Sequence, residues 1–122
     1  MRLDEGAKLI EGELPEGAAM VETEIDRAYA ADLLSDVLAL TDERTTLITG
    51  TISPQVIRVA DILNVIAIIF VRGKRPPQAI IDYAKRLGIP IVFTKKTMFE
   101  TCGLLYANGV RPCKNRPVAN VE

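Results

Sequence analysis

Basic and hydroxyl-bearing side chains gather in three short segments, each of which connects an expected strand to the helix that follows it. The segments are residues 50–53, 72–75 and 94–97. Each leads into a helix N-terminus, where free backbone N–H groups and a partial positive charge favour an anion. The candidate ligand-binding residues are Thr51, Ser53, Arg72, Gly73, Lys74, Arg75, Thr94, Lys95, Lys96 and Thr97.

In an open parallel sheet, ligands bind beyond the carboxyl ends of the strands, which is where these three segments are expected to meet. They therefore predict a site for a phosphate or carboxylate. The alternative is that the lysines and arginines are only solvated loop ends, where such residues are common.

Several other chemistries lack the residues they need. The chain has no histidine, which removes Ser-His-Asp and Cys-His catalysis and the commonest metal ligand. It has no Gly-x-x-x-x-Gly-Lys-Ser/Thr loop, and residues 50–54 lack the glycines of a dinucleotide-binding turn. Two cysteines cannot complete a tetrahedral zinc site. We expect binding or regulation rather than catalysis, with neither cofactor nor metal.

A few carboxylates and thiols leave other uses open. Asp32 and Asp36 are one helical turn apart and close to Asp26, so they could hold a metal or perform acid–base chemistry. An acid in a first helical turn more often only favours the helix dipole. Cys102 fits a core position, whereas Cys113 lies among basic residues that could activate it.

Composition indicates one ordinary globular domain. The 122 residues are 48% hydrophobic and 25% charged. No apolar run approaches the roughly 20 residues of a membrane span, and the acidic N-terminus has no signal-peptide pattern, so we expect a cytoplasmic protein. Nucleic acid is a weak candidate partner because the basic residues are not interleaved with aromatic ones.

Charge is distributed unevenly along the chain. Residues 1–43 carry twelve acids and three bases, a net charge of −9, and residues 44–122 carry twelve bases and four acids, a net charge of +8. This asymmetry either steers an anion or a partner towards one end of the chain, or is neutralised as the two parts pack together.

From residue 45 onward, strand and helix patterns alternate with short connections. Apolar strands are expected at residues 45–49, 65–71 and 91–94. The three following helices open at Ser53-Pro54, at Pro77 and at Thr97, and the second ends at Gly88. This order predicts an α/β three-layer sandwich with a mostly parallel sheet of about four or five strands.

The remaining elements have weaker patterns. Residues 8–13 and 22–29 resemble strands, and residues 32–40 resemble an amphipathic helix whose apolar face uses Leu33, Leu34, Val37 and Leu38. In the last helix, Met98, Phe99, Cys102 and Leu105 are expected to share one apolar face. We expect one domain over residues 1–110 and an extended or flexible tail over residues 111–122.

Residues 29–38, 69–76, 89–94 and 98–106 together resemble the DRTGG domain family, over nearly the whole chain. The letters Asp-Arg-Thr-Gly-Gly themselves are absent, and residues 42–46 are the nearest stretch. The family also resembles the N-terminal domain of HPr kinase/phosphorylase, whose phosphate-binding loop lies in a separate domain. The resemblance implies an α/β fold, a homodimer and an accessory or regulatory role, without kinase activity or catalytic residues.

Two functions follow as expectations. The first is a non-catalytic regulatory or sensory domain that binds a small anionic metabolite or nucleotide at the three loops. The alternative is an interaction module without a small-molecule ligand, a homodimeric adaptor that docks on an enzyme or a signalling partner.

Overall fold

One five-stranded sheet forms the centre of the protein. The computed structural model describes residues 1–18, 20–73 and 75–113. The strand order is β4-β3-β2-β1-β5 and every pairing is parallel, which confirms the predicted α/β sheet. The strands are β1 (Arg27–Ala30), β2 (Thr46–Thr49), β3 (Ala67–Phe70), β4 (Ile91–Phe93) and β5 (Arg111–Pro112).

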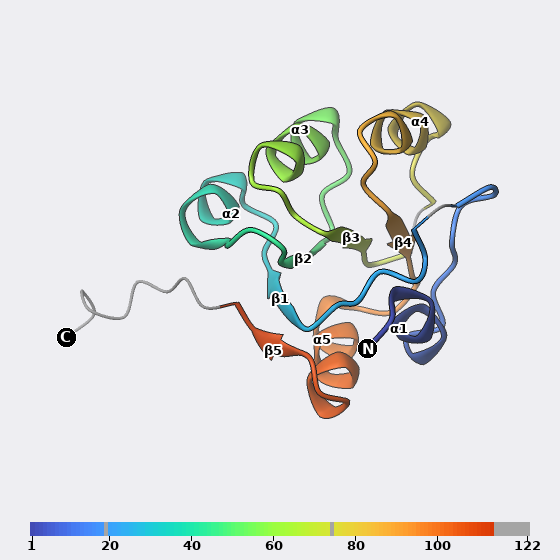
Figure 1. Ribbon diagram of the computed structural model, residues 1–122, viewed down its shortest axis with the longest axis vertical. Coiled ribbons are helices and arrows are strands. Elements are labelled where there is room, and N and C mark those ends of the chain that lie inside the picture. Colours follow the sequence, from blue (N-terminus) through green and yellow to red (C-terminus); the bar gives the residue numbers. More distant parts are fainter. Residues whose placement is uncertain (19, 74, 114–122) are drawn as a thin grey trace.

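Helices cover both faces of the sheet, so the protein is a three-layer sandwich (Figure 1). From β1 to β4 the chain advances steadily across the sheet, and the three connecting helices pack on one face. The return from β4 to β5 runs the opposite way, which puts its helix on the other face, beside the N-terminal helix. The first group is α2 (Leu34–Leu40), α3 (Pro54–Ile62) and α4 (Gln78–Arg86), and the second is α1 (Leu3–Leu9) and α5 (Met98–Ala107).

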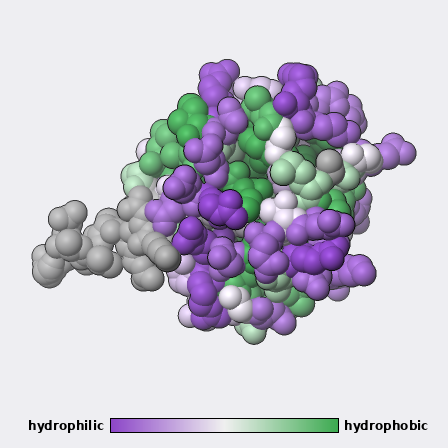
Figure 2. All heavy atoms as spheres, viewed as in Figure 1, coloured by the Kyte–Doolittle hydropathy of each residue, from purple (hydrophilic) through white to green (hydrophobic). Residues whose placement is uncertain are grey.

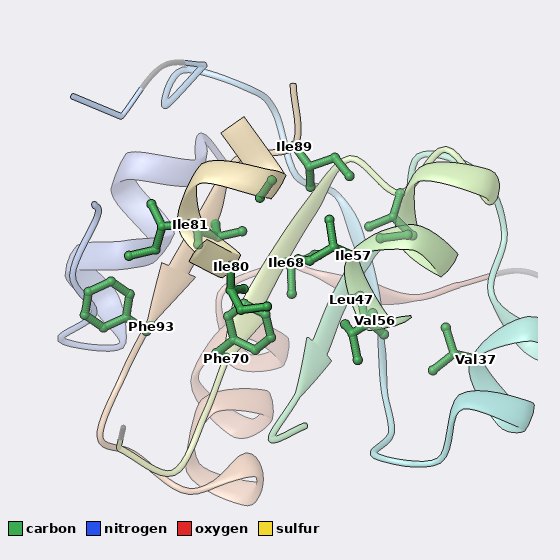
Figure 3. Close-up of a cluster of buried hydrophobic side chains, with 14 residues drawn as sticks. Val37, Leu47, Val56, Ile57, Ile68, Phe70, Ile80, Ile81, Ile89 and Phe93 are labelled. Carbon is green, nitrogen blue, oxygen red and sulfur yellow. The ribbon is translucent and has the colours of Figure 1, made fainter. Parts of the chain in front are cut away.

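The sheet separates two hydrophobic cores because neighbouring residues of a strand face opposite sides. In β2, Leu47 packs under α2, α3 and α4, whereas the next residue, Ile48, packs against α1 and α5. Figure 3 shows the first core, in which side chains from three helices meet those of β2, β3 and β4. All four residues of β3 are buried, as expected of a central strand covered on both faces.

The predicted helix ends are confirmed with small shifts. The Ser53 side chain accepts a hydrogen bond from the backbone N–H of Val56, and Pro54 opens α3. Thr97 caps α5, where it accepts from the backbone N–H of Glu100. Pro77 precedes rather than opens α4, and Gly88 follows that helix with a φ of 75°.

The predicted strand over residues 8–13 is wrong. The chain is helical up to Leu9 because Leu3, Ala7 and Ile10 fall on one side at helical spacing, where all three are buried. The expected strand over residues 22–29 is shifted as well, since β1 occupies residues 27–30.

Three expected core positions are exposed instead. Phe99 has 88% of its surface exposed, so it does not share the buried face of α5. The helix expected from residue 32 begins at Leu34, and Leu33 and Leu38 are mostly exposed. Figure 2 shows hydrophilic side chains over most of the drawn face, with hydrophobic ones at the side of α2 and in smaller groups elsewhere between them.

The chain continues after α5 into the last strand. Arg111 and Pro112 pair with β1, and residues 114–122 lie outside the described part. Among the described helices, none combines the length and the apolar content required to cross a membrane.

Candidate functional site

Four loops meet beyond the carboxyl ends of the parallel strands, and their described residues are 31–33, 50–53, 71–73 with 75–77, and 94–97. Two backbone hydrogen bonds join the loop after β3 to the loop after β4, from Arg72 N to the carbonyl of Lys96 at 2.9 Å and from Gly73 N to the carbonyl of Thr94 at 3.0 Å. Arg72 and Gly73 have positive φ angles of 72° and 96°. This turn therefore holds two of the three predicted segments side by side.

Arg72 forms a half-exposed ion pair with an acid from the loop after β1. Its Nη1 donates to a carboxylate oxygen of Asp32 at 3.0 Å. The other oxygen of Asp32 accepts from the backbone N–H of Gly50 at 2.7 Å and from the hydroxyl of Thr49 at 3.3 Å. The Gly50 N–H is the main cause that lowers the pKa of Asp32, and Arg72 lowers this pKa further. We call these four residues the Asp32–Arg72 cluster.

Gly50 leaves room for the guanidinium in this cluster. A Cβ atom at this position would lie 2.4 Å from Nη2 of Arg72, so the guanidinium rests directly over the glycine. Beside it, the hydroxyl of Thr51 donates to the backbone carbonyl of Asp32 at 3.1 Å. The loop after β2, including Thr51 and Ser53, is thus bound to the loop after β1.

Arg75, Lys95 and Lys96 lie around a pocket of about 380 Å³ at the β4 side of the same edge. Its charged lining comes from two loops and from the segment after α1. The guanidinium of Arg75 lies 5.2 Å from the centre of the ring of Phe93, a buried residue that lines the pocket. This basic pocket is lined by Glu11, Glu13, Gly73, Arg75, Phe93, Thr94, Lys95 and Lys96.

Like the hydroxyl of Thr51, the other three candidate hydroxyls have structural partners. Thr94 is buried, and its hydroxyl donates to the carbonyl of Ile10 at 2.8 Å and accepts from Lys96 N at 3.2 Å. Ser53 and Thr97 cap helices. The backbone N–H of Thr97 also donates to Glu100, which is the main cause that lowers the pKa of Glu100. These hydroxyls shape the loops.

The ten predicted residues therefore fall into separate places. Gly73, Arg75, Thr94, Lys95 and Lys96 line the basic pocket. Arg72 belongs to the Asp32–Arg72 cluster, with Thr51 beside it, whereas Ser53 and Thr97 lie at helix ends. Lys74 lies outside the described residues.

The sequence analysis missed two acids of the pocket, Glu11 and Glu13. A carboxylate oxygen of Glu11 lies 3.8 Å from Nζ of Lys96. Glu13 exchanges two backbone hydrogen bonds with Phe93, at 2.7 and 3.0 Å, along the free edge of β4. No local pattern could reveal this placement, because the partners are some 80 residues further along the chain.

The carboxylates and thiols that the sequence offered as other possible sites lie in surroundings different from those expected. Asp32 precedes α2 and binds Arg72 rather than pairing with Asp36. Within the described residues, no group of three or more histidine, cysteine or acidic side chains could hold a metal. Cys102 of α5 is partly buried beside the hydrophobic core that α1 and α5 cover, and burial raises the pKa of its thiol. Cys113 is buried.

Comparison with solved structures finds a likeness in fold. No protein-family model and no curated protein matches the sequence. The fold is similar to that of the CBS and DRTGG domains of the regulatory region of Clostridium perfringens pyrophosphatase, solved in complex with its activator, diadenosine tetraphosphate. The TM-score is 0.68 at 17% sequence identity, over 96% of this chain and 52% of that one. The chain thus spans about half the length of that structure and shares its fold.

Proposed function

We propose that this chain is a regulatory domain that binds a phosphorylated small molecule, foremost a nucleotide, in the basic pocket. One observation carries the proposal: Arg75 from the loop after β3, and Lys95 and Lys96 from the loop after β4, line a single hollow of about 380 Å³. This volume lies within the range of about 300–1,000 Å³ that is typical of small-molecule sites.

The chemistry of these side chains favours a phosphate. Arg75 and Lys95 are exposed, and neither forms an ion pair with a carboxylate of the described residues. A guanidinium can bind a phosphate through two parallel hydrogen bonds, and an ammonium acts as a point charge. Because the cations come from two loops, an anion with more than one phosphate suits the pocket better than a single carboxylate.

The structural likeness supports the same class of ligand. The similar regulatory region of the Clostridium perfringens pyrophosphatase binds a polyphosphate dinucleotide as an activator. Membership of the DRTGG family, a non-catalytic role and a single domain over residues 1–110 form part of the proposal. A cytoplasmic location stays a prediction.

Isothermal titration with nucleotides and phosphorylated metabolites tests the proposal. We expect saturable binding of at least one phosphorylated compound by the wild-type protein. The double variant Arg75→Glu/Lys95→Glu is expected to lower that affinity at least about a hundredfold, since two charge-assisted hydrogen bonds of about 1.5–3 kcal/mol each are lost and repulsion replaces them.

The variant Arg58→Glu/Arg86→Glu is a matched control, because it reverses two exposed charges on α3 and in the last turn of α4, neither of which lines the pocket. The control should bind as the wild type does. Equal losses in the two variants, or no binding by the wild type, would contradict a phosphate site in the basic pocket.

A specific surface favours the interaction module as a second candidate. Phe99 and Tyr106 of α5 have 88% and 56% of their surfaces exposed, although both are large and apolar. A homodimer or a protein partner would cover them. Sedimentation of the wild type and of Phe99→Ser/Tyr106→Ser tests the homodimer, which predicts a wild-type dimer and a monomeric variant. A monomeric wild type would leave a different protein as the proposed partner.

A further inference from the structure

The basic pocket contains two carboxylates that an anion site alone does not require. Glu11 and Glu13 line the same hollow as Arg75, Lys95 and Lys96. Glu11 is well exposed, and its carboxylate forms an ion pair with Lys96 at 3.8 Å. Among the described residues, the carboxylate of Glu13 has no ion-pair or hydrogen-bond partner. The lining therefore combines three positive with two negative side chains.

The backbone fixes both glutamates at this place independently of their carboxylates. At the end of α1, Glu11 N donates to the carbonyl of Lys8, and Gly12 N donates to the carbonyl of Ala7. This is the helix-ending motif in which glycine usually takes the left-handed position, here occupied by Glu11 with a φ of 54°.

The residue between the two glutamates allows the segment to approach β4. A Cβ atom at Gly12 would lie 2.7 Å from Cγ1 of Val92, so only glycine fits there without a shift. The backbone pairing of Glu13 with Phe93 and the hydrogen bond from Thr94 to Ile10 then hold the segment at the pocket. These contacts fix the backbone from which the side chains of Glu11 and Glu13 extend.

Mixed lining of this kind suits a metal-bound phosphate. Mg²⁺ is usually bound through one or two carboxylates together with the phosphates of a ligand, and it keeps several waters. Two carboxylates do not make a metal site on their own, and the described residues offer no larger group. A polyphosphate held by the three cations would supply the missing oxygens.

We propose that the basic pocket binds the Mg²⁺ complex of a polyphosphate, with Glu11 and Glu13 facing the metal and Arg75, Lys95 and Lys96 facing the phosphates. This inference rests on the proposed function, since it names the form in which the phosphorylated ligand is bound. The competing explanation is that the glutamates only neutralise the neighbouring lysines and so oppose every anion.

The two explanations differ in the sign of one effect. Removal of the carboxylates should weaken the binding of a magnesium polyphosphate, because the metal loses ligands. The same removal should strengthen the binding of a metal-free polyphosphate, because two repelling charges disappear. If the glutamates only oppose anions, binding should strengthen in both conditions.

The experiment is equilibrium dialysis of labelled inorganic pyrophosphate at constant ionic strength, once with excess Mg²⁺ and once with EDTA. The proteins are the wild type, Glu11→Gln/Glu13→Gln, and the control Glu16→Gln/Glu43→Gln, which removes two exposed carboxylates outside the pocket. Thermal unfolding checks the fold, and Glu13→Gln alone serves if the double variant does not fold.

We expect Mg²⁺ to raise the wild-type affinity about tenfold, the equivalent of one charge-assisted contact, and the double variant to lose that gain while the control keeps it. Equal wild-type affinity in both conditions, or tighter binding by the double variant in both, would overturn this inference and leave the phosphate site standing. No pyrophosphate binding by the wild type in either condition would overturn both.

Discussion

Two groups of charges occupy the same edge of the sheet and differ in how their cations are balanced. In the Asp32–Arg72 cluster, Arg72 donates to a carboxylate at 3.0 Å, and that carboxylate also accepts from two further donors. In the basic pocket, Arg75 and Lys95 have no such carboxylate partner among the described residues. The charged side chains of the first group pair with each other, whereas those of the second group line a hollow of about 380 Å³.

This difference shows that the type of a basic residue does not define its role. Arg72 and Arg75 are three positions apart in one loop, yet one joins three loops and the other faces the pocket. A cation with an internal partner is expected to contribute to stability, and a cation without one to binding. The following predictions separate these two contributions.

The largest effect on stability is expected from Asp32→Ala. It leaves the Gly50 N–H, the Thr49 hydroxyl and the Arg72 guanidinium without their acceptor, which we expect to lower the free energy of unfolding by about 2 kcal/mol. Urea denaturation measures the change. The matched variant Glu13→Ala in the pocket should change it little, and equal losses in the two variants would contradict the comparison.

Glycine substitutions should sharpen the comparison at two neighbouring loops. Gly50→Ala places a Cβ atom 2.4 Å from the Arg72 guanidinium, which ends a flexible, half-exposed side chain and can turn away from Asp32, so the substitution should cost no more than about 1 kcal/mol. Gly73→Ala has open space around it, with its nearest neighbour at 3.8 Å, and should cost about 1 kcal/mol through its φ of 96°. Thermal unfolding of both variants measures the two costs, and a loss for Gly50→Ala well above about 1 kcal/mol would mean that the Arg72 guanidinium cannot turn aside.

A stabilising effect is expected on the pocket side from Glu11→Gly. A residue with a side chain is strained by about 1–2 kcal/mol in the left-handed conformation of Glu11, and glycine removes this strain. Glycine also gives the unfolded chain more conformational freedom, which costs about 0.5–1 kcal/mol. The net gain of about 0.5 kcal/mol is measurable by urea denaturation beside Glu16→Gly as a control. A loss of stability would mean that the Glu11 carboxylate is itself a structural contact.

The smallest effect is a pH dependence of the Asp32–Arg72 cluster. The pKa of Asp32 is lowered, first by the Gly50 N–H, so its contribution to stability is complete above the unfolded value of about 3.9 and is lost as the pH falls through the folded pKa. The stability difference between wild type and Asp32→Asn should therefore shrink from pH 5 downwards. A difference that grows on acidification would contradict the ion pair.

The sequence predicts the second half of the fold well because its signals are local. Ser53-Pro54, Gly88 and Thr97 act within one turn of the helices that they begin or end. The apolar run over residues 65–71 is typical of a buried parallel strand. The N-terminal part is predicted poorly, since residues 8–13 alternate like a strand, and only the spacing from Leu3 onward indicates the helix.

The candidate site could be predicted only in part for a related reason. The basic residues follow strands, so topology alone brings Arg75 and Lys95 to one edge. The partners of these loops are far away in sequence: Asp32 precedes Arg72 by 40 residues, and Glu11 precedes Lys96 by 85. Which cation is neutralised therefore depends on tertiary contacts.

The most direct test of this account is pyrophosphate binding by Arg72→Ala and Arg75→Ala, measured by titration at a temperature where both variants are folded. We predict that Arg75→Ala lowers the affinity at least about tenfold, with little change in stability. Arg72→Ala should reduce stability and keep the affinity within about threefold of the wild type. An affinity that falls with Arg72→Ala and persists with Arg75→Ala would contradict the division between a closed cluster and an open binding pocket.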